Sequence, residues 1–203
     1  MINHDKKFVF IHIPKNAGTS VEKHFQYDHK GRPHILASEY AINYPHYYYW
    51  CIIRNTWDRL VSMYHYNSVL TETMSFKEFC VDIVHPQGSK SSPSKEGFVY
   101  FTGVHGQLYL CSGLNGFYQI DYYANFHNLK EDINKVFNIL KIEDKEIPYE
   151  NRTKHDDYRS YYDHECIDAC YARYKHEIDH FGFCFEDPRT TKSFVGLDLS
   201  GIK

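Results

Sequence analysis

Residues 8–20, FVFIHIPKNAGTS, carry the clearest structural pattern in this sequence. Its first half has the length and the aromatic and β-branched composition of a strand that is buried on both faces of a parallel sheet. Pro14 ends this strand, and the amphipathic segment SVEKHF, which begins at Ser20, predicts a helix directly after a short loop. The sequence therefore predicts a strand–loop–helix unit of an α/β fold. The strand residues are Phe8, Val9, Phe10, Ile11 and Ile13.

The loop between this strand and the helix has the composition of an anion site. Lys15 supplies a positive charge, Gly18 lets the backbone approach an anion, and Thr19 and Ser20 supply hydroxyl donors. Backbone N–H groups at the start of a helix favour a phosphate or a sulfate. The loop is not a Walker A sequence, which requires a second glycine and a lysine directly before the hydroxyl residue. The alternative interpretation is a plain strand–turn–helix in which Ser20 caps the helix.

Length, charge and cysteine usage limit the class of protein. The chain has 203 residues, the size of one domain, and a net charge of −3, which argues against a nucleic-acid-binding surface. No apolar run has the length of a membrane span, and we expect no signal peptide before the first strand. The six cysteines lack the pattern of a disulfide framework or a zinc site, so we expect reduced thiols, no metal and a cytoplasmic location.

A second buried strand is predicted at residues 47–53, and it runs directly into Arg54. Apolar residues at three- and four-residue spacings then predict a helix over residues 57–66, with Ser62 on the side that faces back toward Arg54. Open α/β sheets bind ligands at the carboxyl ends of their strands, so this arginine and this hydroxyl form a candidate clamp for a second phosphate. We expect Arg59 to be a structural ion-pair partner.

His34 opens a predicted helix over residues 34–41. A histidine at a junction between a loop and a helix, close to a phosphate-binding loop, can act as a general base near neutral pH. The alternative is a histidine on the surface or at a helix cap.

The two segments together resemble a known family. The loop PKNAGTS, followed in the right order by IRNTWDRLVSMY at residues 53–64, resembles the sulfotransferases that use 3′-phosphoadenosine-5′-phosphosulfate (PAPS). The resemblance is greatest to the branch of heparan sulfate 2-O-sulfotransferases and small bacterial carbohydrate sulfotransferases. It implies a P-loop-like parallel sheet flanked by helices in a single α/β domain. It also implies that the first motif holds the 5′-phosphosulfate and the second the 3′-phosphate. The implied cofactor-binding residues are Lys15, Asn16, Ala17, Gly18, Thr19, Ser20, Arg54 and Ser62.

The resemblance extends over about residues 7–185, with departures. Residues 106–110 are similar to a GQxxYL segment of the family, and residues 120–129 to the family segment IGRFENL. In the second segment Asn125 replaces the usual arginine and His127 the usual glutamate. Lys154 or Arg152 is expected to reach the nucleotide. We expect the domain to span residues 1–186, followed by a loosely attached tail, 187–203, and we interpret the polar residues 87–97 as a loop beside the cleft or an ordinary surface excursion.

The implied reaction is transfer of the sulfuryl group of PAPS to a hydroxyl, most simply that of a carbohydrate, with PAP as the product. Lys15 would stabilise the charge on the departing oxygen and His34 would accept the hydroxyl proton, with His29 and Glu39 as rival bases. Two other functions remain open. A P-loop kinase or NTPase shares the strand–loop–helix start but would require a Walker A lysine and an acidic Mg²⁺ ligand. A non-catalytic glycan-binding relative would explain the departures at Asn125 and His127.

Overall fold

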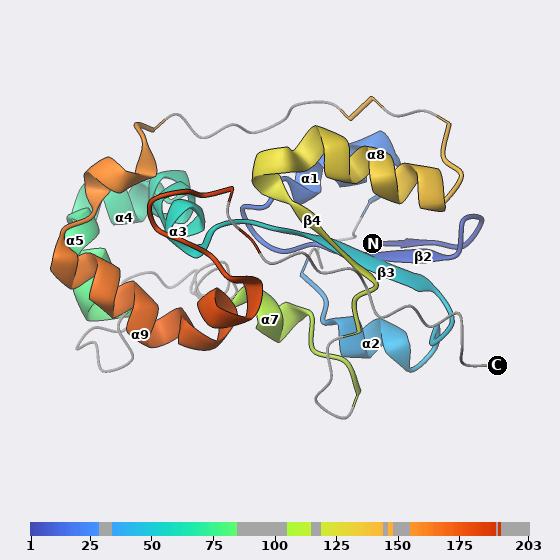
Figure 1. Cartoon of the computed structure of the whole chain (residues 1–203), viewed down its shortest axis with the longest axis horizontal. Coiled ribbons are helices and arrows are strands. Elements are labelled where there is room, and N and C mark those ends of the chain that lie inside the picture. Colours follow the sequence, from blue (N-terminus) through green and yellow to red (C-terminus); the bar gives the residue numbers. More distant parts are fainter. Residues whose placement is uncertain are drawn as a thin grey trace. The chain divides into compact units, whose positions relative to one another are not determined.

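The protein is an α/β protein with a four-stranded mixed sheet flanked by helices (Figure 1). The computed structural model describes residues 1–28, 34–84, 105–114, 119–143, 146–147, 155–189 and 191. The chain divides into two compact units, which we describe separately. The sheet unit consists of Met1–Ile53, Gln107–Asn151 and Ser193–Lys203, and the helical unit of Arg54–Gly106 and Arg152–Lys192. Within the described residues, no helix is long and apolar enough to cross a membrane.

The sheet has the order β1-β2-β3-β4. Strands β2 (Phe8–Ile11), β3 (Tyr48–Ile53) and β4 (Tyr122–Asn125) are parallel, which confirms the predicted parallel pairing. The short strand β1 (Ile2–Asn3) pairs with β2 in the antiparallel direction, so the sheet is mixed and the prediction of a wholly parallel sheet was wrong in this respect. Two residues in β1 were too few to give a period that sequence analysis could detect.

Parallel pairing places the carboxyl ends of β2, β3 and β4 at one edge of the sheet. Ile11 pairs with Cys51, and Ile53 pairs with Asn125. The PKNAGTS loop leaves the sheet at this edge, at the end of β2. It leads into α1 (Gly18–His24), so the predicted strand–loop–helix unit is confirmed, although the helix begins two residues earlier than its sequence pattern indicated.

The core of the sheet unit lies between one face of the sheet and the helices α1 and α8 (Leu129–Ile139). Every second strand residue, such as Phe10 and Trp50, points toward these two helices. The helices α2 (Ala37–Ala41) and α7 (Gln107–Leu110) lie on the opposite side of the sheet (Figure 1). The rings of Trp50 and Phe10 lie 4.6 Å apart, and Phe137 of α8 packs against Trp50 and Phe25. On the α7 side the thiols of Cys51 and Cys111 approach to 3.8 Å.

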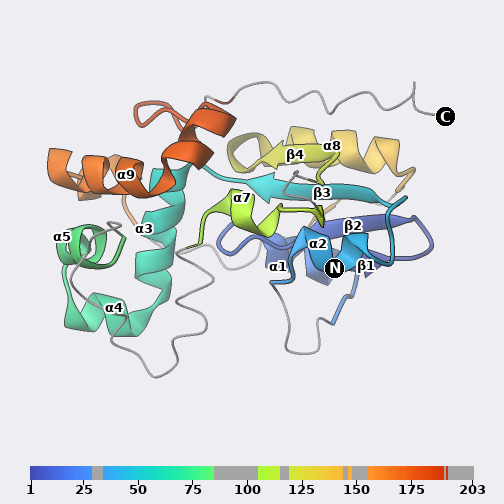
Figure 2. The ribbon, with the colours of Figure 1, turned by 90° about the horizontal axis from the view of Figure 1, so that it is seen from below.

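The helical unit is built around α3 (Thr56–Tyr66) and α9 (His164–Phe181). Figure 2 shows α4 (Ser68–Thr73) continuing from the end of α3, and α9 lying across its beginning. The short helix α5 (Phe76–Glu78) leads into the π-helical turn η1 (Phe79–Val84), and the 3₁₀ turn η4 (Tyr158–Tyr161) precedes α9. Edge-to-face aromatic pairs join these segments, such as Phe76 with Tyr162 at 4.9 Å. All six cysteines of the chain are free thiols.

We predict that Phe137→Ala lowers the free energy of unfolding by about 3–5 kcal/mol, because a fully buried ring leaves a cavity beneath the sheet. Chemical denaturation measured by circular dichroism would give this value. Ile139→Ala is the matched control on the same helix, since Ile139 is 52% exposed and its replacement should change stability by no more than about 0.5 kcal/mol. Equal losses in both variants would contradict the assignment of the core face of α8.

Candidate functional site

The PKNAGTS loop has an unusual backbone conformation. Lys15 has a φ of 69° and Ala17 a φ of 61°, both in the left-handed region, whereas Asn16 between them is not left-handed. Non-glycine residues rarely adopt positive φ, and each such residue costs free energy that its surroundings must offset. Residues that alternate in hand turn their N–H groups toward a common centre and form a concave anion-binding nest. The loop therefore has the alternating left-handed residues found in anion-binding nests, but the N–H of Asn16 donates to the carbonyl oxygen of Ile13 and that of Ser20 to the carbonyl oxygen of Ala17.

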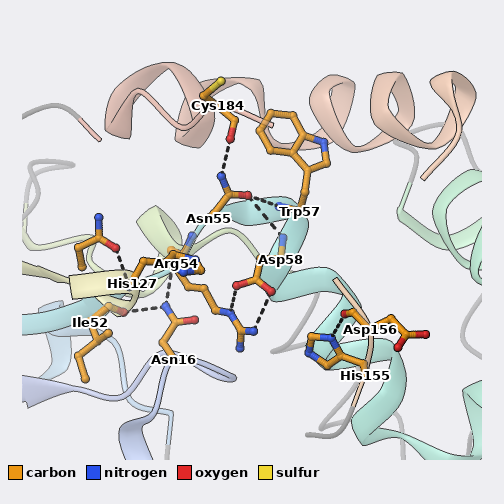
Figure 3. Close-up of polar contacts among 12 residues, drawn as sticks. Asn16, Ile52, Arg54, Asn55, Trp57, Asp58, His127, His155, Asp156 and Cys184 are labelled. Atoms are coloured by element: carbon orange, nitrogen blue, oxygen red, sulfur yellow. Dashed lines mark hydrogen bonds and ion pairs between the residues drawn. The ribbon is translucent and has the colours of Figure 1, made fainter. Parts of the chain in front are cut away.

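The side chain of Asn16 holds this loop in place. It is buried, and its Nδ2 donates a hydrogen bond of 2.7 Å to the carbonyl oxygen of Ile52 in β3 (Figure 3). The same Nδ2 donates another hydrogen bond of 2.7 Å to Oε1 of Gln107 in α7. The predicted GQxxYL segment thus contributes a fully buried glutamine that contacts the loop. The Asn16 side-chain amide is thus directed into the protein, and its backbone N–H donates to the carbonyl oxygen of Ile13 at 3.3 Å. Its predicted role in cofactor binding stays a prediction.

Sequence reasoning missed a histidine and a glutamate beneath the loop. The imidazole of His12 packs directly on Gly18, so that a Cβ at position 18 would overlap its ring atoms. His12 Nδ1 lies 3.0 Å from Oε1 of Glu22, and both side chains are buried. One signal was available, because Glu22 follows Gly18 by four residues and therefore lies on the same face of α1.

His34 lies beside His12. Its Nδ1 is 3.1 Å from the carbonyl oxygen of His12, and the two rings meet edge to face at 4.8 Å. Donation from Nδ1 to this carbonyl assigns the proton of neutral His34 to Nδ1 and leaves Nε2 as the basic nitrogen. His34 is not in a helix, because α2 begins only at Ala37, so the predicted helix over residues 34–41 was wrong at its start. The rival Glu39 accepts a hydrogen bond of 3.4 Å from the N–H of Leu36 at the start of α2.

In the helical unit, Arg54 precedes α3 and is paired with Asp58. Its Nε donates to Oδ2 of Asp58 at 2.7 Å and its Nη2 to Oδ1 at 2.9 Å, and both side chains are nearly buried (Figure 3). Asn55 caps α3 by accepting from the N–H of Trp57, and its Nδ2 donates to the carbonyl oxygen of Cys184. The start of α3 is therefore fixed on two sides. Ser62 is buried two turns into the same helix.

Arg59 lies in the interior of the helical unit. It is fully buried, and its Nη2 donates to the carbonyl oxygen of His105 at 2.8 Å. Among the described residues it forms no ion pair with a carboxylate, so its expected ion-pair role stays a prediction. The nearby Glu177 instead accepts a hydrogen bond of 2.6 Å from the hydroxyl of Thr56. Burial lowers the pKa of His105, and the neighbouring Arg173 and Arg59 lower this pKa further.

The departures at Asn125 and His127 form a local cap. Asn125 Oδ1 accepts a hydrogen bond of 2.9 Å from the N–H of His127 and so begins the 3₁₀ turn η3 (Phe126–Asn128). The N–H of Asn125 donates to Oδ2 of Asp132 in α8 at 2.7 Å. In this chain, Asn125 connects the end of β4 with the first turn of α8.

The structure thus places the predicted residues in two groups. The sheet unit contains the loop residues Lys15 to Ser20 and His34, and the helical unit contains Arg54 and Ser62. Lys154, Arg152, His29 and residues 87–97 lie outside the described residues. Within the part of the chain that the structure describes, no group of three histidine, cysteine, aspartate or glutamate side chains is arranged to hold a metal ion.

Comparison with known proteins identifies no relative of this chain. No family model matches it, and no curated protein or solved structure matches it.

We predict that Asn16→Ala lowers the free energy of unfolding by about 1–3 kcal/mol, because the buried acceptors on Ile52 and Gln107 lose their donor. Urea denaturation measures this loss. Asn43→Ala removes an exposed asparagine and serves as the control, with almost no expected change. A loss no larger than that of the control would show that the two hydrogen bonds of the Asn16 side chain contribute nothing to stability.

Proposed function

We propose that the protein is a PAPS-dependent sulfotransferase that transfers a sulfuryl group to a hydroxyl of a carbohydrate acceptor. The observation that carries the proposal is the conformation of the PKNAGTS loop, which follows a buried parallel strand and alternates left-handed residues at Lys15 and Ala17. A shape suited to an anion therefore occurs in the segment that resembles the 5′-phosphosulfate motif. The second motif keeps its arginine and its serine at the resembling positions, Arg54 and Ser62.

The residues of the sheet unit have the chemistry that the proposed transfer requires. PAPS supplies the sulfuryl group, and in the reaction the S–O bond to the phosphate breaks while a new S–O bond forms to the acceptor hydroxyl. Lys15, the loop N–H groups and Ser20 would stabilise negative charge on the departing oxygen. His34 would accept the acceptor proton at Nε2, because its Nδ1 is oriented by the carbonyl oxygen of His12.

The helical unit has the chemistry expected for the 3′-phosphate. Asp58 occupies the Nε and Nη2 donors of Arg54, which orients the plane of the guanidinium. The fork of a guanidinium suits the geometry of a phosphate. Ser62 would add a hydroxyl, and Lys154 a second positive charge.

The acceptor and the compartment belong to the same proposal. A carbohydrate hydroxyl is favoured by the branch of the family that the motifs resemble, which is an argument from analogy. The free thiols are typical of a protein in a reducing compartment, so we place the enzyme in the cytoplasm.

We predict that PAP binds the wild-type protein and that Arg54→Ala weakens this binding by about 10- to 100-fold, because a charge-assisted contact with the 3′-phosphate is lost. Isothermal titration calorimetry measures the affinity, and ATP with Mg²⁺ is titrated in parallel. Failure of PAP to bind the folded wild type would refute the proposal. Preference for ATP with Mg²⁺ would instead support a kinase or NTPase.

The pairing of Arg54 with Asp58 determines the controls for this experiment. Arg54→Ala alone leaves a nearly buried carboxylate without its partner, which can destabilise the fold by itself. The double variant Arg54→Ala/Asp58→Asn removes that charge and should remain folded while still binding PAP weakly. Asp58→Asn alone keeps the Arg54 charge but loosens the orientation of its guanidinium, so its PAP affinity should lie between those of the wild type and Arg54→Ala.

We predict that His34→Ala lowers sulfate transfer by about 10²–10⁴-fold and leaves PAP binding nearly unchanged, because the residue would act on the acceptor proton. Transfer from radiolabelled PAPS to a panel of glycans measures turnover, and calorimetry measures PAP binding. His46→Ala, which removes an exposed histidine, is the control. Unchanged turnover of His34→Ala would exclude His34 as the base.

A further inference from the structure

The buried pair formed by His12 and Glu22 has no role in the proposed chemistry. Burying a carboxylate is unfavourable unless a neighbouring group compensates it. In this structure the Nδ1 atom of His12 lies 3.0 Å from Oε1 of the buried Glu22. A chain that needed only to fill this space could use apolar residues. The pair therefore calls for an explanation beyond packing.

The position of the His12 ring links the pair to the loop. The ring lies against Gly18, the first residue of α1, so closely that no side chain fits between them. Glu22 lies one helical turn further along α1 and contacts the same ring through Nδ1. The His12 ring thus contacts Glu22 of α1, and its bulk also limits how closely Gly18, at the end of the loop, can approach β2.

The same histidine also contacts the candidate base. Its carbonyl oxygen accepts from Nδ1 of His34, and the two rings meet edge to face. Displacement of His12 would therefore move the loop at Gly18 and the orientation of His34 together.

We propose that His12, oriented by Glu22, is the positioning residue of the anion-binding loop. Its imidazole fixes Gly18 and thereby the direction of the neighbouring N–H groups toward a phosphate or sulfate ester. Its Nδ1 also lies 3.0 Å from Oε1 of Glu22. The identity of the anion, the 5′-phosphosulfate of PAPS, rests on the proposed function, whereas the positioning of the loop does not.

The test is a double-mutant cycle between His12 and Gly18. Gly18→Ala introduces a Cβ that the His12 ring does not accommodate, so PAP affinity should fall on the order of 10- to 100-fold as the loop moves. His12→Ala vacates that space, so the double variant His12→Ala/Gly18→Ala should bind PAP at least about tenfold more tightly than Gly18→Ala. Additive effects of the two substitutions would overturn the proposal, because residues that do not interact show no coupling.

A second measurement requires no ligand. Amide hydrogen exchange of residues 15–20 should become faster by about tenfold or more in His12→Ala, because the loop loses the ring that packs on Gly18. His24→Ala removes another imidazole of α1, whose Nδ1 instead contacts the carbonyl oxygen of Glu146, and should leave the loop amides unchanged. Unchanged exchange in His12→Ala would overturn the proposal. If PAP does not bind the wild type, the proposed function fails, but this measurement still decides the role of His12.

Substitutions of Glu22 distinguish positioning from packing, and they apply even if His12→Ala does not fold. Glu22→Gln keeps a polar side chain of the same size beside His12 Nδ1, whereas Glu22→Leu places an apolar side chain of similar volume there. We expect wild-type loop exchange in Glu22→Gln and faster exchange in Glu22→Leu, with a changed ¹⁵N shift of His12 Nδ1 in the leucine variant alone. Identical behaviour of the two variants would show that the pair only fills space.

Discussion

The amide of Asn16 determines the form of the candidate site, because it joins the loop to two other elements at the carboxyl edge of the sheet. Its two donors reach Ile52 in β3 and Gln107 in α7, which are far from it in sequence. The left-handed backbone conformations of the residues on either side of Asn16 cost conformational free energy. The buried, rigid hydrogen bonds of Asn16 can offset this cost. The loop can thus hold this conformation without a ligand, which would reduce the ordering that binding of the proposed anion requires.

Buried charge is the second organising feature, since the described part of the chain encloses several charged groups near its two motifs. Arg54 is paired with Asp58, Glu22 Oε1 lies 3.0 Å from His12 Nδ1, and Glu177 accepts a hydrogen bond from the hydroxyl of Thr56. Replacing one partner of such a pair leaves an uncompensated charge, so effects on folding and on binding become mixed. This is why paired substitutions that remove both charges are more informative here than single alanine substitutions.

Sequence patterns predicted the parts of the fold that depend on local periodicity. The strand from Phe8, the strand that ends at Ile53 and the helix that follows it were all found within a few residues. The two compact units were not predicted, because each is assembled from stretches that are separated in the sequence, with no linker at the change from Ile53 to Arg54. The short strand β1 was missed for a related reason, since its pairing with β2 is visible only in three dimensions.

Within the candidate site, residue types were more predictable than their partners. A lysine, a glycine and two hydroxyls indicated an anion loop, but the spacing did not show that Asn16 turns inward or that His12 packs on Gly18. Arg59 illustrates the same limit. Its position in the motif suggested an ion pair, yet its Nη2 donates to a backbone carbonyl brought near by the chain 46 residues later. A buried charged side chain requires a polar partner, but the sequence alone does not show whether that partner is a carboxylate, a backbone carbonyl or a ligand.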